Sequence, residues 1–192
     1  MLYSSLLAPF LLLSASVLGS PVSLERRNNT SSLDVPPPPE LKWLYTLYAT
    51  VPEDLMNNKL TPAGIRRALP ITGGNFTGPG LEGKLLDLGA DWGTVDPRTG
   101  IFTADTRYNG RTKQGEDLYF RTTGPVTPDG SLHLYINIET GSERLYWLNN
   151  VLAVGVLHNL GKNEDGVMLL RIDAYNFKSD WNSTTFLNQT SW

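Results

Sequence analysis

The polar residues that could carry chemistry in this sequence lie in segments where polar and apolar side chains alternate. Asp105 and Arg107 are separated by one residue, so in an extended strand both side chains point to the same face. If that face is the inner one of a barrel, the guanidinium holds the carboxylate ionised beside a ligand. If it is the outer one, the two residues form an ordinary surface ion pair. The spacing leaves both orientations open.

A second group of candidates lies on the polar face of the segment 131–139. Tyr135, Asn137 and Glu139 share that face with His133. Phenol, carboxylate and imidazole groups can transfer protons without a cofactor, so these residues are candidates for acid–base chemistry or ligand binding. The alternative is a strand face that is in contact with water.

Two aromatic motifs give the remaining candidates for ligand binding. Asp91 and Trp92 are expected at a strand end near a barrel mouth, where an indole can pack on an apolar ligand beside a carboxylate. The alternative is a turn-capping Asp and a core Trp. Trp147 and Asn149 precede an apolar strand, where they either line a ligand entrance or plug one end of the barrel.

Composition excludes several classes of function. The chain of 192 residues is 40% hydrophobic, which is enough for a core, and its net charge of -3 argues against a nucleic-acid partner. It contains no cysteine and only two histidines, His133 and His158, so one chain cannot supply thiolate ligands or three histidines to a metal. We therefore predict a protein with no metal and no cofactor.

The elements that must position the candidate residues are predicted to be β-strands. Strand-like composition or alternation occurs in seven segments: 41–51, 81–88, 101–109, 116–123, 131–139, 150–158 and 166–177. Turn residues such as Asn109–Gly110 and Asp165–Gly166 separate some of them. This pattern predicts one all-β domain at 41–177, either a sandwich or, as we favour, a single antiparallel barrel with the general shape of a lipocalin. A short helical turn is expected at 61–67, and the glycines between 73 and 83 are expected to form tight turns and close backbone approaches at a barrel corner.

The two ends of the chain predict export. Residues 6–18 are apolar but shorter than the roughly 20 residues that cross a bilayer, which favours a signal peptide at 1–19 and no membrane span after its cleavage. A proline-rich spacer at 20–40 and a tail at 178–192 are expected to be disordered. Asn-x-Ser/Thr sequons, which predict N-glycosylation of a secreted protein, begin at Asn28, Asn29, Asn75, Asn182 and Asn188.

The segment 73–92, GGNFTGPGLEGKLLDLGADW, resembles the signature of the domain of unknown function (DUF) 3237 family of small β-barrel proteins. The resemblance continues through residues 105–108 and 146–149, and it spans residues 41–177. It implies an antiparallel barrel. It supplies no settled activity and no agreed catalytic residues.

The function predicted from these observations is the binding of a small organic molecule inside a secreted barrel. One alternative is a cofactor-independent isomerase, cyclase or lyase whose acid–base residues lie in the barrel. A further alternative is a surface carbohydrate-binding protein that uses Trp43, Trp147, Trp181 and Trp192. The sequence leaves open whether the protein is an enzyme.

Overall fold

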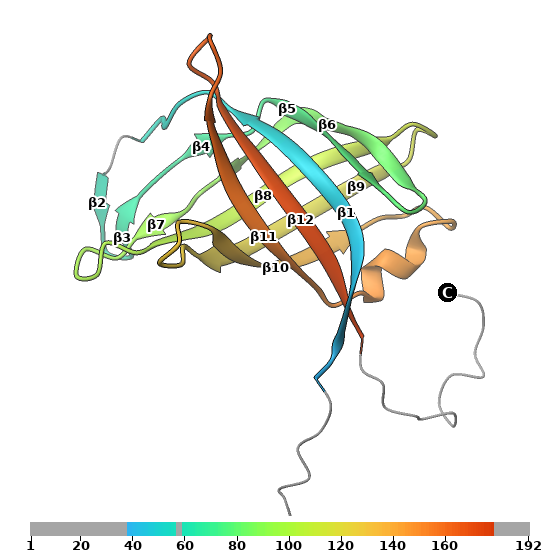
Figure 1. Ribbon diagram of the computed structural model, residues 1–192. Helices are drawn as coiled ribbons and strands as arrows, with labels where there is room; N and C mark the ends of the chain where they lie inside the picture. Colours follow the sequence, from blue (N-terminus) through green and yellow to red (C-terminus); the bar gives the residue numbers. More distant parts are fainter. Residues whose placement is uncertain (1–37, 57–58, 179–192) are drawn as a thin grey trace, which may run out of the picture. The chain divides into compact units, whose positions relative to one another are not determined.

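The computed structural model describes residues 38–56 and 59–178, which fold almost entirely into β-strands (Figure 1). The long strands are β1 (Glu40–Val51), β5 (Gly73–Gly78), β6 (Leu81–Asp91), β8 (Phe102–Thr112), β9 (Asp117–Pro125), β10 (Leu132–Glu139), β11 (Ala153–Lys162) and β12 (Met168–Lys178). The short elements are β2 (Lys59–Thr61), β3 (Gly64–Arg66), β4 (Leu69–Pro70), β7 (Thr94–Val95) and the 3-10 helix η1 (Tyr146–Asn150).

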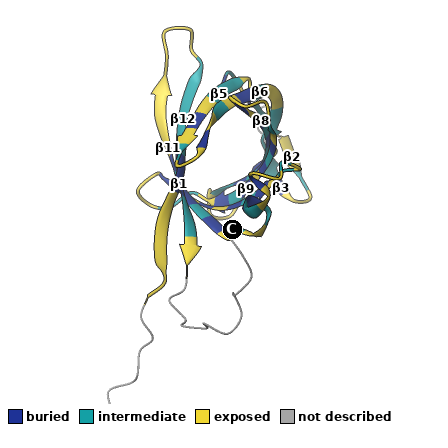
Figure 2. Cartoon of the chain, turned by 90° about the vertical axis from the view of Figure 1, so that its right-hand side faces the viewer, coloured by how far each residue is buried: buried dark blue, intermediate teal, exposed yellow. Residues whose placement is uncertain are grey.

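The eight long strands form a closed antiparallel ring. Their order is β1-β5-β6-β8-β9-β10-β11-β12, and β12 pairs with β1. The pairing of β6 with β8 completes the ring, which is seen nearly end-on in Figure 2. The prediction of a single antiparallel barrel is therefore confirmed, and the sandwich is excluded.

Alternation divides each strand between the barrel interior and its outer surface. On β8, Thr106 and Tyr108 are buried on the inner face and pair with Thr122 and Phe120 of β9. Asp105 and Arg107, which flank Thr106 along the strand, lie on the outer face. Paired residues of antiparallel strands share a face, so this assignment extends around the ring.

A layer of four aromatic side chains fills the middle of the barrel. The ring of Phe120 stacks on Tyr108 at a centroid distance of 5.0 Å and meets Tyr45 and Phe76 edge-on, each at 5.8 Å. Each such pair contributes about 0.5–1.5 kcal/mol beyond the burial of its area.

The two ends of the barrel differ. At one, which we call the η1 end, the 3-10 helix follows β10, and Leu145 and Leu148 pack into the core. At the opposite one, which we call the Asp91 end, β6 ends, β8 begins, and the short strands β2, β3, β4 and β7 lie (Figure 1).

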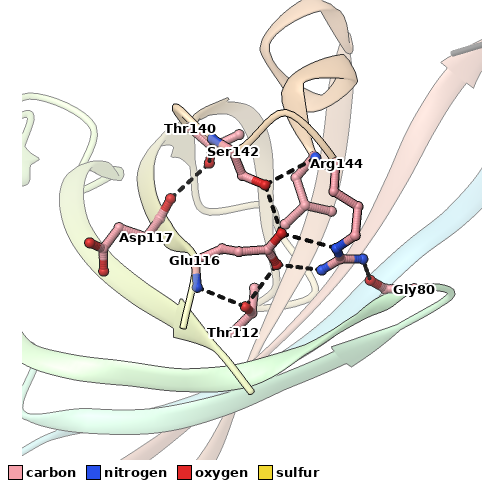
Figure 3. A network of polar contacts seen from close by, with 8 residues as sticks. Gly80, Thr112, Glu116, Asp117, Thr140, Ser142 and Arg144 are labelled. Carbon is pink, nitrogen blue, oxygen red and sulfur yellow. Dashed lines mark hydrogen bonds and ion pairs between the residues drawn. The ribbon is translucent and has the colours of Figure 1, made fainter. Parts of the chain in front are cut away.

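A network of hydrogen bonds connects the chain segments at the η1 end (Figure 3). The Glu116 carboxylate accepts hydrogen bonds from the Ser142 hydroxyl at 2.6 Å, the Thr112 hydroxyl at 2.9 Å and Arg144 Nε at 3.0 Å. Arg144 Nη1 also donates to the carbonyl oxygen of Gly80 at 3.0 Å. The network thus joins the β8–β9 and β5–β6 turns to the segment before η1. Hydrogen bonds from Arg144 and Ser142 lower the pKa of Glu116 to about 2.

Three expectations about local structure need correction. Asn109–Gly110, expected to form a turn, lies inside β8 and pairs with β9. The predicted helical turn at 61–67 is wrong, because β2 and β3 form a hairpin there and Gly64 has a φ of +115°, which an α-helix does not allow. The glycines of 73–78 belong to β5 rather than to a turn, although they do serve close backbone approach: a Cβ at Gly74 would lie 1.9 Å from the Tyr48 carbonyl oxygen.

Several sequence predictions fall outside the described residues. They concern the signal peptide, most of the proline-rich spacer, the C-terminal tail beyond Lys178 and the sequons at Asn28, Asn29, Asn182 and Asn188. Within the described part of the chain, no helix is sufficiently long and apolar to span a membrane.

The close pairing of β9 with β10 depends on Gly124, because a Cβ there would lie 1.9 Å from the carbonyl oxygen of His133. We expect Gly124→Ala to lower the free energy of unfolding by roughly 3 kcal/mol, since backbone atoms must move apart. The control Gly141→Ala, where a Cβ meets nothing within 4 Å, should stay within about 0.5 kcal/mol of wild type. Urea unfolding measures both, and equal midpoints for the two variants would contradict this packing.

The network at Glu116 predicts a pH dependence of stability. Its pKa is lowered in the folded state, so its ionised form contributes stability above the unfolded-state pKa, and that contribution is lost as the pH falls toward about 2. Glu116→Gln should therefore be less stable than wild type at pH 7, and the difference should shrink between pH 5 and pH 2. Thermal melts across this range provide the measurement, and a difference that stays constant with pH would argue against the charged network.

Candidate functional site

Asp91 is the one sequence-predicted candidate whose carboxyl group the strand register directs into the barrel. It is the last residue of β6 and pairs with Thr106 of β8, a buried residue of the inner face. Its Oδ1 accepts a hydrogen bond from the backbone N–H of Asp105 at 2.9 Å, which fixes the carboxylate against β8. Sequence reasoning placed this residue at a strand end near the barrel mouth, and the structure confirms that position.

The surroundings of Asp91 favour its protonated form. Burial raises the pKa of this carboxyl group, and the nearby charge of Asp105 raises it further. The Asp105 N–H and the Thr106 hydroxyl act in the opposite direction without cancelling the shift. None of the ion pairs in the described part of the chain includes Asp91. A carboxyl group with a raised pKa is a candidate for general acid–base chemistry.

Toward the Asp91 end, some residues of the inner face keep a small exposure. Thr106, Leu132 and Leu157 retain 7%, 8% and 9% of their exposure, whereas Phe76 and Phe120 in the aromatic layer retain 1% each. Small inward residues, Ala104 and Gly124 among them, also line this half. A molecule that enters from the Asp91 end would contact these side chains first.

Trp92 lies on the rim of the same end. Its side chain is 41% exposed, while its backbone N–H donates to the Asp105 carbonyl oxygen at 3.0 Å and its own carbonyl accepts a hydrogen bond from Arg66. The structure therefore places an exposed indole next to the inward carboxyl group. Its role in ligand binding stays a prediction.

Asp105 and Arg107 point to the outer surface. They form an ion pair with 3.2 Å between Asp105 Oδ1 and Arg107 Nη1, and both side chains are more than one-third exposed. The structure thus resolves the orientation that spacing left open. An exposed pair of this kind contributes about 0–1 kcal/mol to stability and cannot act on a molecule inside the barrel.

The candidates on β10 also face outward. Tyr135 is 48% exposed, Glu139 is exposed and Asn137 is half-buried, whereas Ile136 and Ile138 between them are buried in the interior. The expected division of this strand into a polar and an apolar face is confirmed. Its polar face belongs to the outer surface, so these three residues are not brought together with Asp91.

Trp147 and Asn149 lie at the η1 end. Asn149 holds η1 to the end of β10, since its side chain accepts a hydrogen bond from the Thr140 N–H at 2.9 Å and donates to the Thr140 carbonyl oxygen at 3.0 Å. Trp147 and Trp43 line a recess of about 850 Å³ on the outside of this end. Of the four tryptophans proposed for carbohydrate binding, Trp43 and Trp147 therefore lie near each other at this recess. Trp181 and Trp192 lie outside the described residues.

Sequence reasoning did not single out the polar groups that share the interior with Asp91, namely Thr106, Tyr108 and Tyr45. The alternation of β8 places Thr106 and Tyr108 on one face with Ala104, and that pattern was a usable signal. Among the residues that the structure describes, no group of three or more His, Asp or Glu side chains is arranged to hold a metal ion.

Comparison with known proteins identifies relatives in sequence. A UPF0311 protein of Rhodopseudomonas palustris is 31% identical over 60% of this chain and 86% of the relative. The hydroalkoxylation enzyme phnH of Penicillium herquei is 26% identical over 66% of this chain and 80% of the relative.

Solved structures show the same barrel. A β-barrel-like protein from Acinetobacter baumannii matches with a TM-score of 0.64 and 31% identity, covering 76% of this chain and 99% of that one. An enzyme from Penicillium herquei matches with a TM-score of 0.59 and 24% identity, covering 75% and 98%. The family model described as "Protein of unknown function (DUF3237)" matches residues 39–134, half of the sequence, and the chain belongs to this family.

Proposed function

We propose that this protein binds a small organic molecule at the Asp91 end of its barrel and that Asp91 transfers a proton to or from that molecule. The observation that carries the proposal is a half-buried, inward-facing carboxyl group whose pKa is raised by desolvation. A barrel that only stores a ligand has no need of such a group, whereas general acid–base catalysis does. This favours cofactor-independent catalysis over simple binding.

A single carboxyl group that can hold a proton is sufficient for one class of reaction, the acid-catalysed addition of a hydroxyl group to a double bond. A protonated Asp91 can give its proton to a carbon of a double bond, and the neighbouring carbon then becomes electron-deficient. A hydroxyl group of the same molecule forms a bond to that carbon and passes its proton to the Asp91 carboxylate. The acid is regenerated, one ring is formed, and no oxidant, reductant or cofactor is consumed.

The relative from Penicillium herquei supports this class of reaction, because it is named a hydroalkoxylation enzyme. Hydroalkoxylation is the addition of an alcohol O–H across a carbon–carbon double bond, which has the proton balance given above. For the present chain we propose the same class, an isomerising proton transfer with ring closure, and leave the scaffold of the substrate open.

Replacement of Asp91 by Asn tests the proposal, because an amide keeps the shape but cannot exchange the proton. Ortho-prenylated phenols in D2O are suitable probes, since ring closure leaves the molecular formula unchanged apart from deuterium at carbon. We expect turnover by wild type and a roughly 100-fold or larger loss in Asp91→Asn. Asp87→Asn, an exposed carboxylate on the same strand, should retain wild-type turnover. Mass spectrometry of the product measures rate and label together.

Two results would contradict the proposal. The first is equal turnover by wild type and Asp91→Asn. The second is a wild-type protein that neither converts the probes nor gives saturation-transfer NMR signals with them.

We propose further that the chain is exported and glycosylated, as its leader and sequons predict. Asn75, the one sequon asparagine in the described residues, has an exposed side chain on β5, where a glycan would not disturb the core. In a eukaryotic secretory host, the full chain should reach the medium cleaved after residue 19, and Asn75→Gln should remove one glycan by mass. Retention in the cells with residues 1–19 still attached would argue against export.

A further inference from the structure

Two tyrosine hydroxyl groups lie in the interior of the barrel without an ordinary hydrogen-bond partner. Tyr45 of β1 is 1% exposed and Tyr108 of β8 is 2% exposed. Neither hydroxyl oxygen has a partner of normal hydrogen-bond geometry among the described residues. An unsatisfied buried hydroxyl costs about 1–3 kcal/mol, so the pair calls for an explanation. Phe76 and Phe120 in the same aromatic layer show that a ring without a hydroxyl group fits this environment.

The two hydroxyl groups approach each other. Burial raises the pKa of both tyrosines, and the neighbouring Tyr108 raises that of Tyr45 further. If one hydroxyl donates to the other, a single mutual bond uses one of the two O–H groups. At least one donor then remains without an acceptor. Because both phenols stay protonated at neutral pH, they offer donors and no negative charge.

These donors lie on the same interior surface as Asp91. Tyr108 pairs with Gly89, two residues before Asp91 on β6, and Asp91 pairs with Thr106, two residues before Tyr108 on β8. The Cα atoms of such diagonal neighbours lie about 7–8 Å apart. Asp91 and Tyr108 therefore belong to one stretch of the inner face, where one small molecule could contact both side chains.

The charges of the interior restrict the kind of oxygen that could bind. In the described ranges, the buried polar residues besides the two tyrosines are Thr106, Thr112, Thr122 and Ser131, and none of the buried residues is Lys, Arg or His. A ligand carboxylate or phosphate would thus enter a site with no cation and with Asp91 nearby. A neutral carbonyl oxygen avoids that cost and accepts hydrogen bonds from both phenols.

Building on the proposed function, we infer that the Tyr45 and Tyr108 hydroxyl groups bind a ketone-type oxygen of the same molecule whose carbon Asp91 protonates. The substrate class is then a neutral aromatic or unsaturated ketone. As Asp91 gives its proton to a double bond elsewhere in this molecule, the two phenols hold the carbonyl oxygen in place. Tyr45 and Tyr108 are binding residues in this account, and Asp91 alone exchanges the proton.

The experiment compares two probes that differ in the carbonyl group, acetophenone and ethylbenzene. Wild type should bind acetophenone roughly three- to tenfold more tightly than ethylbenzene, the effect of one or two neutral hydrogen bonds. In Tyr45→Phe and Tyr108→Phe the preference should fall toward one, with ethylbenzene binding retained. The carbonyl stretching frequency of bound acetophenone should shift to lower values in wild type and less in the two variants. Tyr135→Phe on the outer face, where the phenol is 48% exposed, is the matched control and should behave as wild type.

Thermal melts of the ligand-free variants separate a binding role from a structural one. If the hydroxyl groups serve a ligand and not the fold, Tyr45→Phe and Tyr108→Phe should melt at or above the wild-type temperature. Lower melting temperatures in both, together with weaker binding of both probes, would assign the hydroxyls to the fold and overturn the inference.

The remaining outcomes are also decisive. An unchanged preference for acetophenone in the two variants would overturn the inference while leaving the proposed function intact. Failure of wild type to bind either probe would contradict the interior site itself, and the inference would fall with the proposed function.

Discussion

The pairing of β6 with β8 is the contact on which the rest of this structure depends. It converts an open sheet into a ring and removes the unpaired edges of its long strands. Two glycines make the contact possible, since a Cβ at Gly83 would lie 2.3 Å from the Arg111 carbonyl oxygen and one at Gly89 would lie 2.5 Å from that of Arg107. The register shift between Leu85 and Gly89 then sets Asp91 opposite Thr106, on the inner face.

The closed ring places Asp91 and Asp105, which lie on adjacent strands, in opposite surroundings. Asp105 lies outside, partly solvated and beside Arg107, whereas Asp91 lies inside, half-buried and without a cation at ion-pair distance among the described residues. Water and a guanidinium stabilise the charge of the first carboxylate, and burial opposes the charge of the second. The same fold therefore places an exposed ion pair and a carboxyl group with a raised pKa on adjacent strands, and the tyrosine hydroxyls extend the polar interior beyond Asp91.

Alternation in the sequence was sufficient to predict the barrel, most of its long strands and the two faces of β10. It could not predict which face of β8 is the inner one, because both faces of that strand mix polar and apolar residues, with Thr106 and Tyr108 on one and Asp105 and Arg107 on the other. The glycine-rich strand β5 escaped prediction, since glycine is depleted in ordinary strands and is required here by close backbone approach. The bonds of Glu116 to Ser142 and Arg144 join residues far apart in the sequence, and no local pattern reveals them.

The central claim is that the Asp91 carboxyl group lies inside the barrel and holds a proton more strongly than an exposed aspartate. Carbon-13 NMR of the Asp91 carboxyl carbon during a pH titration measures this directly, with Asp91→Asn used to assign the signal. The account predicts a midpoint clearly above that of an ordinary aspartate, which is about 3.9, and a further change when a ligand occupies the interior. A midpoint at or below the ordinary value would show that the carboxylate is solvated or paired, and the proton-transfer role would be lost.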